Sequence, residues 1–187
     1  MDRGRSHKAH LVTRDLRIME RLSPPPSRNL ARGLLVIHSV PSALRRHIDW
    51  AIQSLLGNHR DVEWKSQPLI AGTYRTTIEW RDGVGLASQL ASSLRTWHYI
   101  HFEVQEISDE GGEIFRFTPE LGIHRGVFDA SGAIQIGEFM VTNILKNSFD
   151  EESLREGLAL ALGTDWENEL ERFRGVDLQE ASHLRAI

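Results

Sequence analysis

Apolar and polar positions alternate with changing periods along the chain, and each period predicts one kind of element. Residues 33–38 form a short apolar run, which is typical of a strand covered on both faces. Residues 43–56 carry apolar side chains at helical spacing and are followed by Gly57, a residue that favours the end of a helix. Ser39 or Ser42 would cap the start of this helix. The apolar positions of this predicted helix are Leu44, Ile48, Ala51, Ile52 and Leu55.

The same reasoning predicts two strands, a helix and a further strand over the next part of the chain. Residues 61–68 and 73–81 alternate between apolar and polar side chains, as half-exposed strands do. A helix is expected over 84–96, with Leu86, Leu90 and Leu94 on its buried stripe, and a strand over 98–107. The predicted order is β-α-β-β-α-β, which is the ferredoxin-like arrangement.

The C-terminal part of the chain predicts two β-hairpins and then helices. The turn signals at 108–112 and 129–132 separate short alternating segments. The predicted strands are 113–118, 121–128 and 133–136, and the predicted helices are 138–146, 151–162 and 165–173. The fold class is therefore predicted to be α+β: a ferredoxin-like core extended by two β-hairpins and a C-terminal helical segment.

The proline run at Ser23–Ser27 sets the expected domain boundaries. Consecutive prolines cannot continue a helix or supply hydrogen-bond donors to a sheet. We therefore expect a disordered basic arm and linker over residues 1–31, a single α+β domain over 32–175, and a tail over 176–187.

Composition narrows the class of protein. The 187 residues carry a formal net charge of −4 and include no cysteine, so disulfides, thiolate nucleophiles and cysteine-ligated metals are excluded. No apolar run approaches the roughly 20 residues of a membrane helix, and no apolar core follows the N-terminal basic residues. A soluble cytoplasmic protein without a membrane partner is expected.

The charge is distributed unevenly. Residues 1–32 hold eight Lys and Arg against three Asp and Glu, and residues 138–187 hold five against eleven. A basic arm can contact nucleic acid or an anionic surface. A solvated tail, which could rest against the acidic C-terminal part, is favoured over a nucleic-acid partner for this arm. RNA binding by the sheet is not expected either, because the charge around the predicted strand aromatics is balanced or acidic and no RNA-binding motif is present.

The histidines and the C-terminal carboxylates do not form a recognisable metal site. His98 and His101 are three positions apart, which places them on opposite faces of a strand. We expect no metal and no cofactor. The acidic residues at two-residue spacing spread around a helix and predict a solvated acidic surface, or a docking surface for a basic partner. These acidic residues are Asp165, Glu167, Glu169 and Glu171.

The turn between the first strand and the first helix is the best candidate for a ligand site. A helix N-terminus offers free N–H groups and the positive end of a dipole, so an anion could bind there. The candidate ligand-binding residues are His38, Ser39, Ser42, Arg45, Arg46 and His47. The Gly-x-Ser-x-Gly elbow of serine hydrolases is missing, and no catalytic residue is assigned.

Four segments resemble an actinobacterial family of unknown function, DUF3145. They are His38–Ala51, Trp97–Val104, Phe117–His124 and Leu162–Arg174. The resemblance implies a cytoplasmic setting and carries no activity or catalytic residue. If genes of this family lie near fatty-acid synthesis genes, the resemblance implies a regulatory or accessory role in lipid metabolism.

Two functions follow as hypotheses. The first is a non-catalytic binding or regulatory module that forms a homodimer or binds a protein partner. The alternative is an enzyme that acts on an anionic small molecule at the turn from His38 to His47, with His38 as acid or base.

Overall fold

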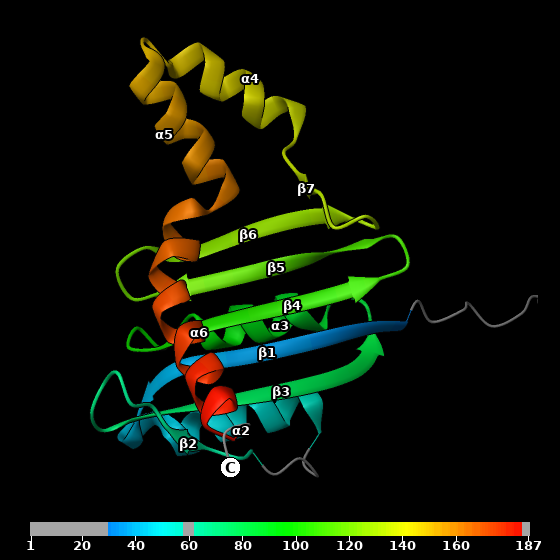
Figure 1. Cartoon of the computed structure of the whole chain (residues 1–187). Coiled ribbons are helices and arrows are strands. Elements are labelled where there is room, and N and C mark those ends of the chain that lie inside the picture. The colour runs from blue at the N-terminus through cyan, green and yellow to red at the C-terminus, as the bar shows by residue number, and fades with distance from the viewer. Residues whose placement is uncertain (1–29, 58–61, 185–187) are drawn as a thin grey trace, which may run out of the picture.

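The computed structural model describes residues 30–57 and 62–184, and within them the strands form one antiparallel sheet (Figure 1). The strand order is β2-β3-β1-β4-β5-β6-β7. The strands are β1 (Leu30–Pro41), β2 (Lys65–Ser66), β3 (Thr73–Gly83), β4 (His101–Ser108), β5 (Gly111–Thr118), β6 (Gly122–Asp129) and β7 (Ile134–Gln135). The predicted α+β class is confirmed.

The helices cover both faces of this sheet. They are α2 (Arg45–Leu56), α3 (Leu86–Leu94), α4 (Glu138–Asn147), α5 (Glu151–Leu162) and α6 (Thr164–Leu184), with a 3-10 turn at Ser42–Leu44. Figure 1 shows α2 and α3 behind the sheet, α6 crossing its front, and α4 and α5 projecting beyond β6 and β7. Among the helices of the described chain, none is long and apolar enough to cross a membrane.

The main hydrophobic core lies between the sheet and helices α2 and α3. Its fully buried side chains include Leu35, Ile37, Ile48, Ile52, Leu90, Leu94, Ile100, Phe102 and Val104. The helical stripes predicted from the sequence are the buried ones. Gly33 is required in this core, because a Cβ at that position would lie only 2.0 Å from the ring of Trp80.

Several predicted boundaries move. The first strand begins at Leu30, and α6 continues to Leu184, beyond the expected end of the domain at residue 175; residues 1–29 lie outside the described part. The strand expected over 61–68 is reduced to Lys65–Ser66, and Pro68, two residues after it, cannot donate to a ladder. The other edge strand, β7, also has only two residues, so both edges of the sheet are short.

Two local predictions are wrong. Ser39 lies inside β1, and neither the 3-10 turn that begins at Ser42 nor α2 has a side-chain cap at its start. His98 lies in a turn before β4, so it does not share a strand with His101.

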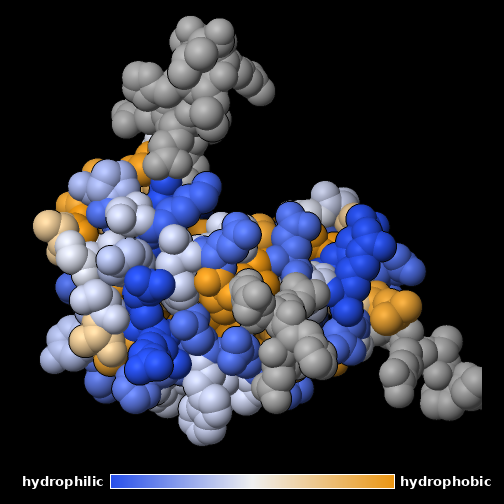
Figure 2. All heavy atoms as spheres, turned by 90° about the horizontal axis from the view of Figure 1, so that it is seen from below, coloured by the Kyte–Doolittle hydropathy of each residue, from blue (hydrophilic) through white to orange (hydrophobic). Residues whose placement is uncertain are grey.

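In Figure 2, which views the β2 edge and α2 from below, hydrophilic residues dominate and hydrophobic ones lie between them.

Candidate functional site

An irregularity in β1 places His38 on the sheet face that α6 covers. Ile37 pairs with Phe102 and the next paired residue, Ser39, pairs with His101, so His38 is an extra residue in the strand. Such β-bulges redirect side chains and occur often beside functional sites. Gln67 stabilises the bulge, because its side-chain amide donates a hydrogen bond of 2.6 Å to the carbonyl of His38.

Glu103 on β4 is the centre of a buried charge network on this face. His38 Nε2 donates to Glu103 Oε1 over 2.8 Å. Arg174 on α6 donates through Nε (2.9 Å) and Nη2 (2.6 Å) to the two carboxylate oxygens, in the two-pronged geometry that suits Arg and carboxylate groups. Burial alone would raise the pKa of Glu103, but the hydrogen bonds from His38 and Arg174 lower it to about 2.

Helix α6 reaches this network because one side of it is apolar. Trp166, Leu170 and Phe173 are buried against the sheet at helical spacing, and Trp166 Nε1 donates to the carbonyl of Gly122 over 2.9 Å. The Phe173 ring lies between two histidines, 5.9 Å from the ring of His38 and 4.9 Å from that of His101.

The carboxylates beside this apolar stripe do not form a free acidic surface. Glu167 pairs with Arg116 on β5 over 2.6 Å and also contacts Arg174. Glu169 faces His101. The prediction of a solvated acidic helix is therefore wrong for these two residues, because the neighbouring apolar side chains hold them at the edge of the buried surface.

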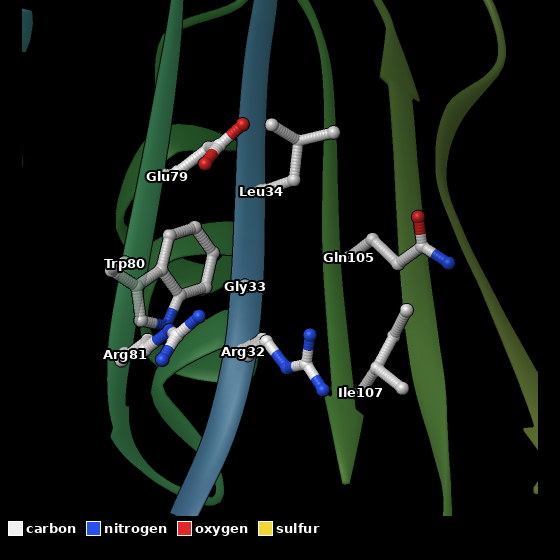
Figure 3. Close-up of a pocket in the computed structure, with 8 residues that line it drawn as sticks. All are labelled: Arg32, Gly33, Leu34, Glu79, Trp80, Arg81, Gln105 and Ile107. Atoms are coloured by element: carbon white, nitrogen blue, oxygen red, sulfur yellow. The ribbon is translucent and has the colours of Figure 1, made fainter.

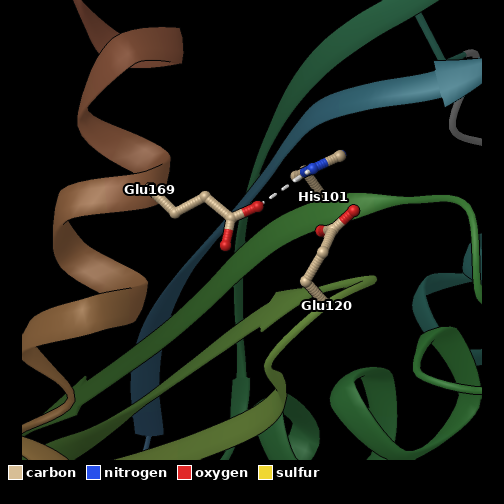
Figure 4. A group of neighbouring side chains, drawn as sticks. All are labelled: His101, Glu120 and Glu169. Carbon is tan, nitrogen blue, oxygen red and sulfur yellow. Dashed lines mark ion pairs between the residues drawn. The ribbon is translucent and has the colours of Figure 1, made fainter.

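A second cluster adjoins the first and contains His101, Glu120 and Glu169 (Figure 4). One nitrogen of the histidine and one oxygen of each carboxylate lie within 4.8 Å of one another. Figure 4 shows the two carboxylates turned toward the imidazole, Glu169 from α6 and Glu120 from the turn after β5.

Burial shifts the pKa values of His101 and Glu169 in the direction that favours the uncharged form of each side chain. Burial, above all, lowers the pKa of His101 to about 4, against the raising effect of Glu120. Burial and the adjacent Glu120 carboxylate raise the pKa of Glu169, while a hydrogen bond with Thr118 lowers it. At neutral pH the imidazole can therefore act as a ligand or a proton acceptor, whereas Glu103 is ionised and already bonded.

The six candidate residues from the sequence lie in different environments. His38 and Ser39 are buried in β1, whereas Ser42, Arg46 and His47 are exposed.

Two of these six residues rest against aromatic rings. The guanidinium of Arg45 lies over Tyr74, 4.2 Å from the ring centroid, and the ring of His47 stacks on Trp97 at 5.4 Å. Ligand binding at the turn between β1 and α2 stays a prediction.

Sequence reasoning did not bring together the residues at the junction of α6 and the sheet. Glu103 is 65 positions from His38 and 71 from Arg174, and no local spacing connects them. A signal was nevertheless present, because the four segments that carry the family resemblance contain them. The residues concerned are His38, His101, Glu103, Glu120, Glu167, Glu169 and Arg174.

A pocket of about 610 Å³ lies on the strands β3, β1 and β4 (Figure 3). Its lining mixes charged, polar and apolar side chains. The lining residues are Arg32, Gly33, Leu34, Glu79, Trp80, Arg81, Gln105 and Ile107.

The arm formed by α4 and α5 has the opposite character to α6. Neither helix has a buried residue. Phe139 at the start of α4 is 85% exposed, and Phe149 in the connection to α5 is 94% exposed. The two helices meet where Gly157 leaves room for Ile144, since a Cβ on Gly157 would lie 2.7 Å from the Ile144 side chain.

Comparison with known proteins identifies the family and no function. A family model described as a protein of unknown function (DUF3145) matches residues 34–185. Searches of curated proteins and of solved structures give no match. The chain therefore belongs to the DUF3145 family, and the resemblance noted in the sequence is confirmed.

Proposed function

We propose that this member of the DUF3145 family is a non-catalytic binding module that works as a homodimer, with the α4–α5 arm as the dimer contact. The observation that carries the proposal is the lack of any buried residue in α4 or α5, although both helices contain large apolar side chains.

Two helices of this size need a surface to pack on. Isolated helices shorter than about 12–15 residues are marginal in water, and α4 and α5 have 10 and 12 residues. A helical hairpin is stabilised when its apolar side is covered by another layer. Two such hairpins related by a two-fold axis supply that layer to each other and form a four-helix bundle.

The exposed apolar area of the arm is large enough for such a contact. Its exposed apolar side chains are Phe139, Met140, Leu145, Phe149, Leu160 and Leu162. Since a large aromatic side chain alone buries about 150–250 Å², these six side chains offer on the order of 700 Å². A standard interface buries about 800 Å² per partner.

The sheet edges are poor alternatives for association. An exposed edge recruits another chain through a row of unpaired N–H and C=O groups, and very short edge strands limit this. Both edge strands here, β2 and β7, have two residues. The arm therefore offers the second copy a better contact than either edge.

We also propose that the first half of the sheet is a ferredoxin-like unit. Support comes from the strands β2-β3-β1-β4, which are antiparallel neighbours, and from α2 and α3, which connect them in the order β-α-β-β-α-β. The hairpins and α6 then extend this unit. An accessory role in fatty-acid metabolism stays a prediction from the resemblance alone.

The alternative of an enzyme at His38 has less support. His38 is 4% exposed, and its Nε2 is bonded to an ionised Glu103 that also binds Arg174. An acid or base must reach the substrate within hydrogen-bond distance. Burial and this bond leave His38 better placed to hold the sheet and α6 together.

The proposal is tested by light scattering coupled to size-exclusion chromatography over a range of protein concentrations. We expect a dimer for the parent chain and a monomer for the double variant Phe139→Glu, Phe149→Glu. Trp50→Glu is the matched control, since Trp50 is a 72% exposed aromatic residue on α2, away from the arm. A parent that stays monomeric, or a double variant that stays dimeric, contradicts the proposal.

A further inference from the structure

We infer that His101, Glu120 and Glu169 bind a divalent transition-metal ion that connects α6 to the sheet. The three residues come from separate elements: the start of β4, the turn between β5 and β6, and α6. The inference does not depend on the dimer, because the arm contributes no residue to this cluster.

The three ligand atoms are up to about 1.5 Å farther apart than in a closed zinc site. The three potential ligand atoms lie within 4.8 Å of one another. Zinc binds imidazole nitrogen and carboxylate oxygen at about 2.0–2.2 Å, which places ligand atoms roughly 3–3.5 Å apart. Glu120 is exposed and can close the remaining distance by rotating its side chain.

His101 supplies an independent observation. Its side chain is 9% exposed, and Nδ1 is buried and lacks a hydrogen-bond partner among the described residues. Nε2 points at Glu169 Oε1 across 3.6 Å, which is too long for a hydrogen bond. An ion between Nε2 and the two carboxylates would give this nitrogen the bond that Glu169 does not supply at 3.6 Å.

The charges around the cluster also favour a cation. Two carboxylates face one imidazole, and the guanidinium of Arg172 lies beside them, with Nη2 3.7 Å from Glu169 Oε1. The Arg172 side chain is 58% exposed and lies over the Phe173 ring, so it can turn into solvent when an ion binds. Arg172 thus competes with the ion for Glu169.

The ligand set selects the class of ion. Mg²⁺ and Ca²⁺ prefer sites made of oxygen atoms alone, whereas imidazole suits Zn²⁺ and its first-row neighbours. One imidazole and two carboxylates match Zn²⁺ or Mn²⁺, with water completing the coordination. Because the ligands span β4 and α6, ion binding stabilises the position of α6 on the sheet.

Calorimetric titration of the chelator-treated full chain with Zn²⁺ and with Mn²⁺ tests the inference. We expect one high-affinity ion per chain, and an affinity at least about tenfold weaker in Glu120→Gln and in Glu169→Gln. Glu171→Gln is the matched control, because Glu171 lies on the same helix and contacts Arg174 instead of the cluster. Arg172→Gln is expected to bind the ion more tightly. The visible spectrum of bound Co²⁺ gives a second readout, which the two ligand variants should alter.

Two results would overturn the inference. One is the absence of saturable binding by the parent chain up to about 1 mM ion. The other is equal affinity in the parent, Glu120→Gln and Glu169→Gln, which would place the ion elsewhere on the chain. The monomeric arm variant should retain the ion, so failure of the dimer proposal and failure of the metal proposal are distinguishable.

Discussion

Helix α6 and the α4–α5 arm are neighbours in the sequence, and both combine apolar and acidic residues, yet they use them differently. Helix α6 buries Trp166, Leu170 and Phe173 against the sheet, whereas the arm buries nothing. The difference lies in the opposing surface. The sheet presents cationic and imidazole groups to the carboxylates of α6, whereas the arm projects past β6 and β7 (Figure 1).

The comparison separates two ways of satisfying an amphipathic helix. In helix α6 the apolar stripe of Trp166, Leu170 and Phe173 and the charges of Glu167 and Arg174 have partners within the same chain. The arm has an exposed apolar side that no other described part of the chain covers. The largest effects of substitution are therefore expected under α6, and the smallest in the arm when the protein is dilute.

Replacing Glu103 by Ala should have the largest effect. It leaves His38 and Arg174 without their shared carboxylate in a buried setting, and removal of one partner from a buried ion pair costs about 3–5 kcal/mol. Urea denaturation measures the change in the free energy of unfolding. Glu171→Ala, which removes an exposed partner of the same Arg174, should change it by less than about 0.5 kcal/mol. Similar values for the two variants would show that the network does not hold α6.

Acid should weaken the same junction. The pKa of Glu103 is about 2 in the folded chain against an ordinary value of 4.5, so the unfolded chain takes up the proton first as the pH falls. The stabilisation is present above pH 4.5 and is lost toward pH 2, with a total of about 3 kcal/mol. The difference in unfolding free energy between the parent and Glu103→Gln, measured with chelator present, should shrink over this range. A constant difference would argue against an ionised, hydrogen-bonded Glu103.

Gly163→Ala should have an intermediate effect. Gly163 ends α5 with φ of 73°, and a Cβ there would lie 2.5 Å from the ring of His124. An alanine at this positive φ would strain the backbone, and its methyl group would overlap the ring of His124. We therefore expect the free energy of unfolding to fall by about 1–3 kcal/mol. Thermal unfolding measures the loss, with Gly83→Ala as control because an added Cβ at Gly83 meets nothing within 4 Å. Equal melting temperatures for the two variants would show that the turn between α5 and α6 tolerates change.

Phe139→Ser should have the smallest effect in dilute protein. Phe139 is 85% exposed, and exposed substitutions usually change the free energy of unfolding by less than about 0.5 kcal/mol. At high concentration the parent should unfold at a higher temperature than the variant, because dimer formation stabilises the folded state by mass action. Identical concentration dependence in both chains would count against the arm as the contact.

The sequence predicted local structure better than long-range contact. The stripes of α2 and α3 follow from the spacing of residues such as Ile48 and Leu90, because one buried face requires that period. The bulge at His38 has no such signature, since it depends on the register between β1 and β4. The acidic residues of α6 looked solvated because Arg116 and His101, which face them, are distant in the sequence.

Hydrogen–deuterium exchange over a concentration series tests the central contrast most directly, because it reports α4, α5 and α6 in one experiment. Amides of α6 should be protected at every concentration, since the helix is held within the chain. Amides of α4 and α5 should exchange quickly in dilute protein and become protected as the concentration rises. Full protection of the arm at the lowest concentration, or none at the highest, would contradict the account.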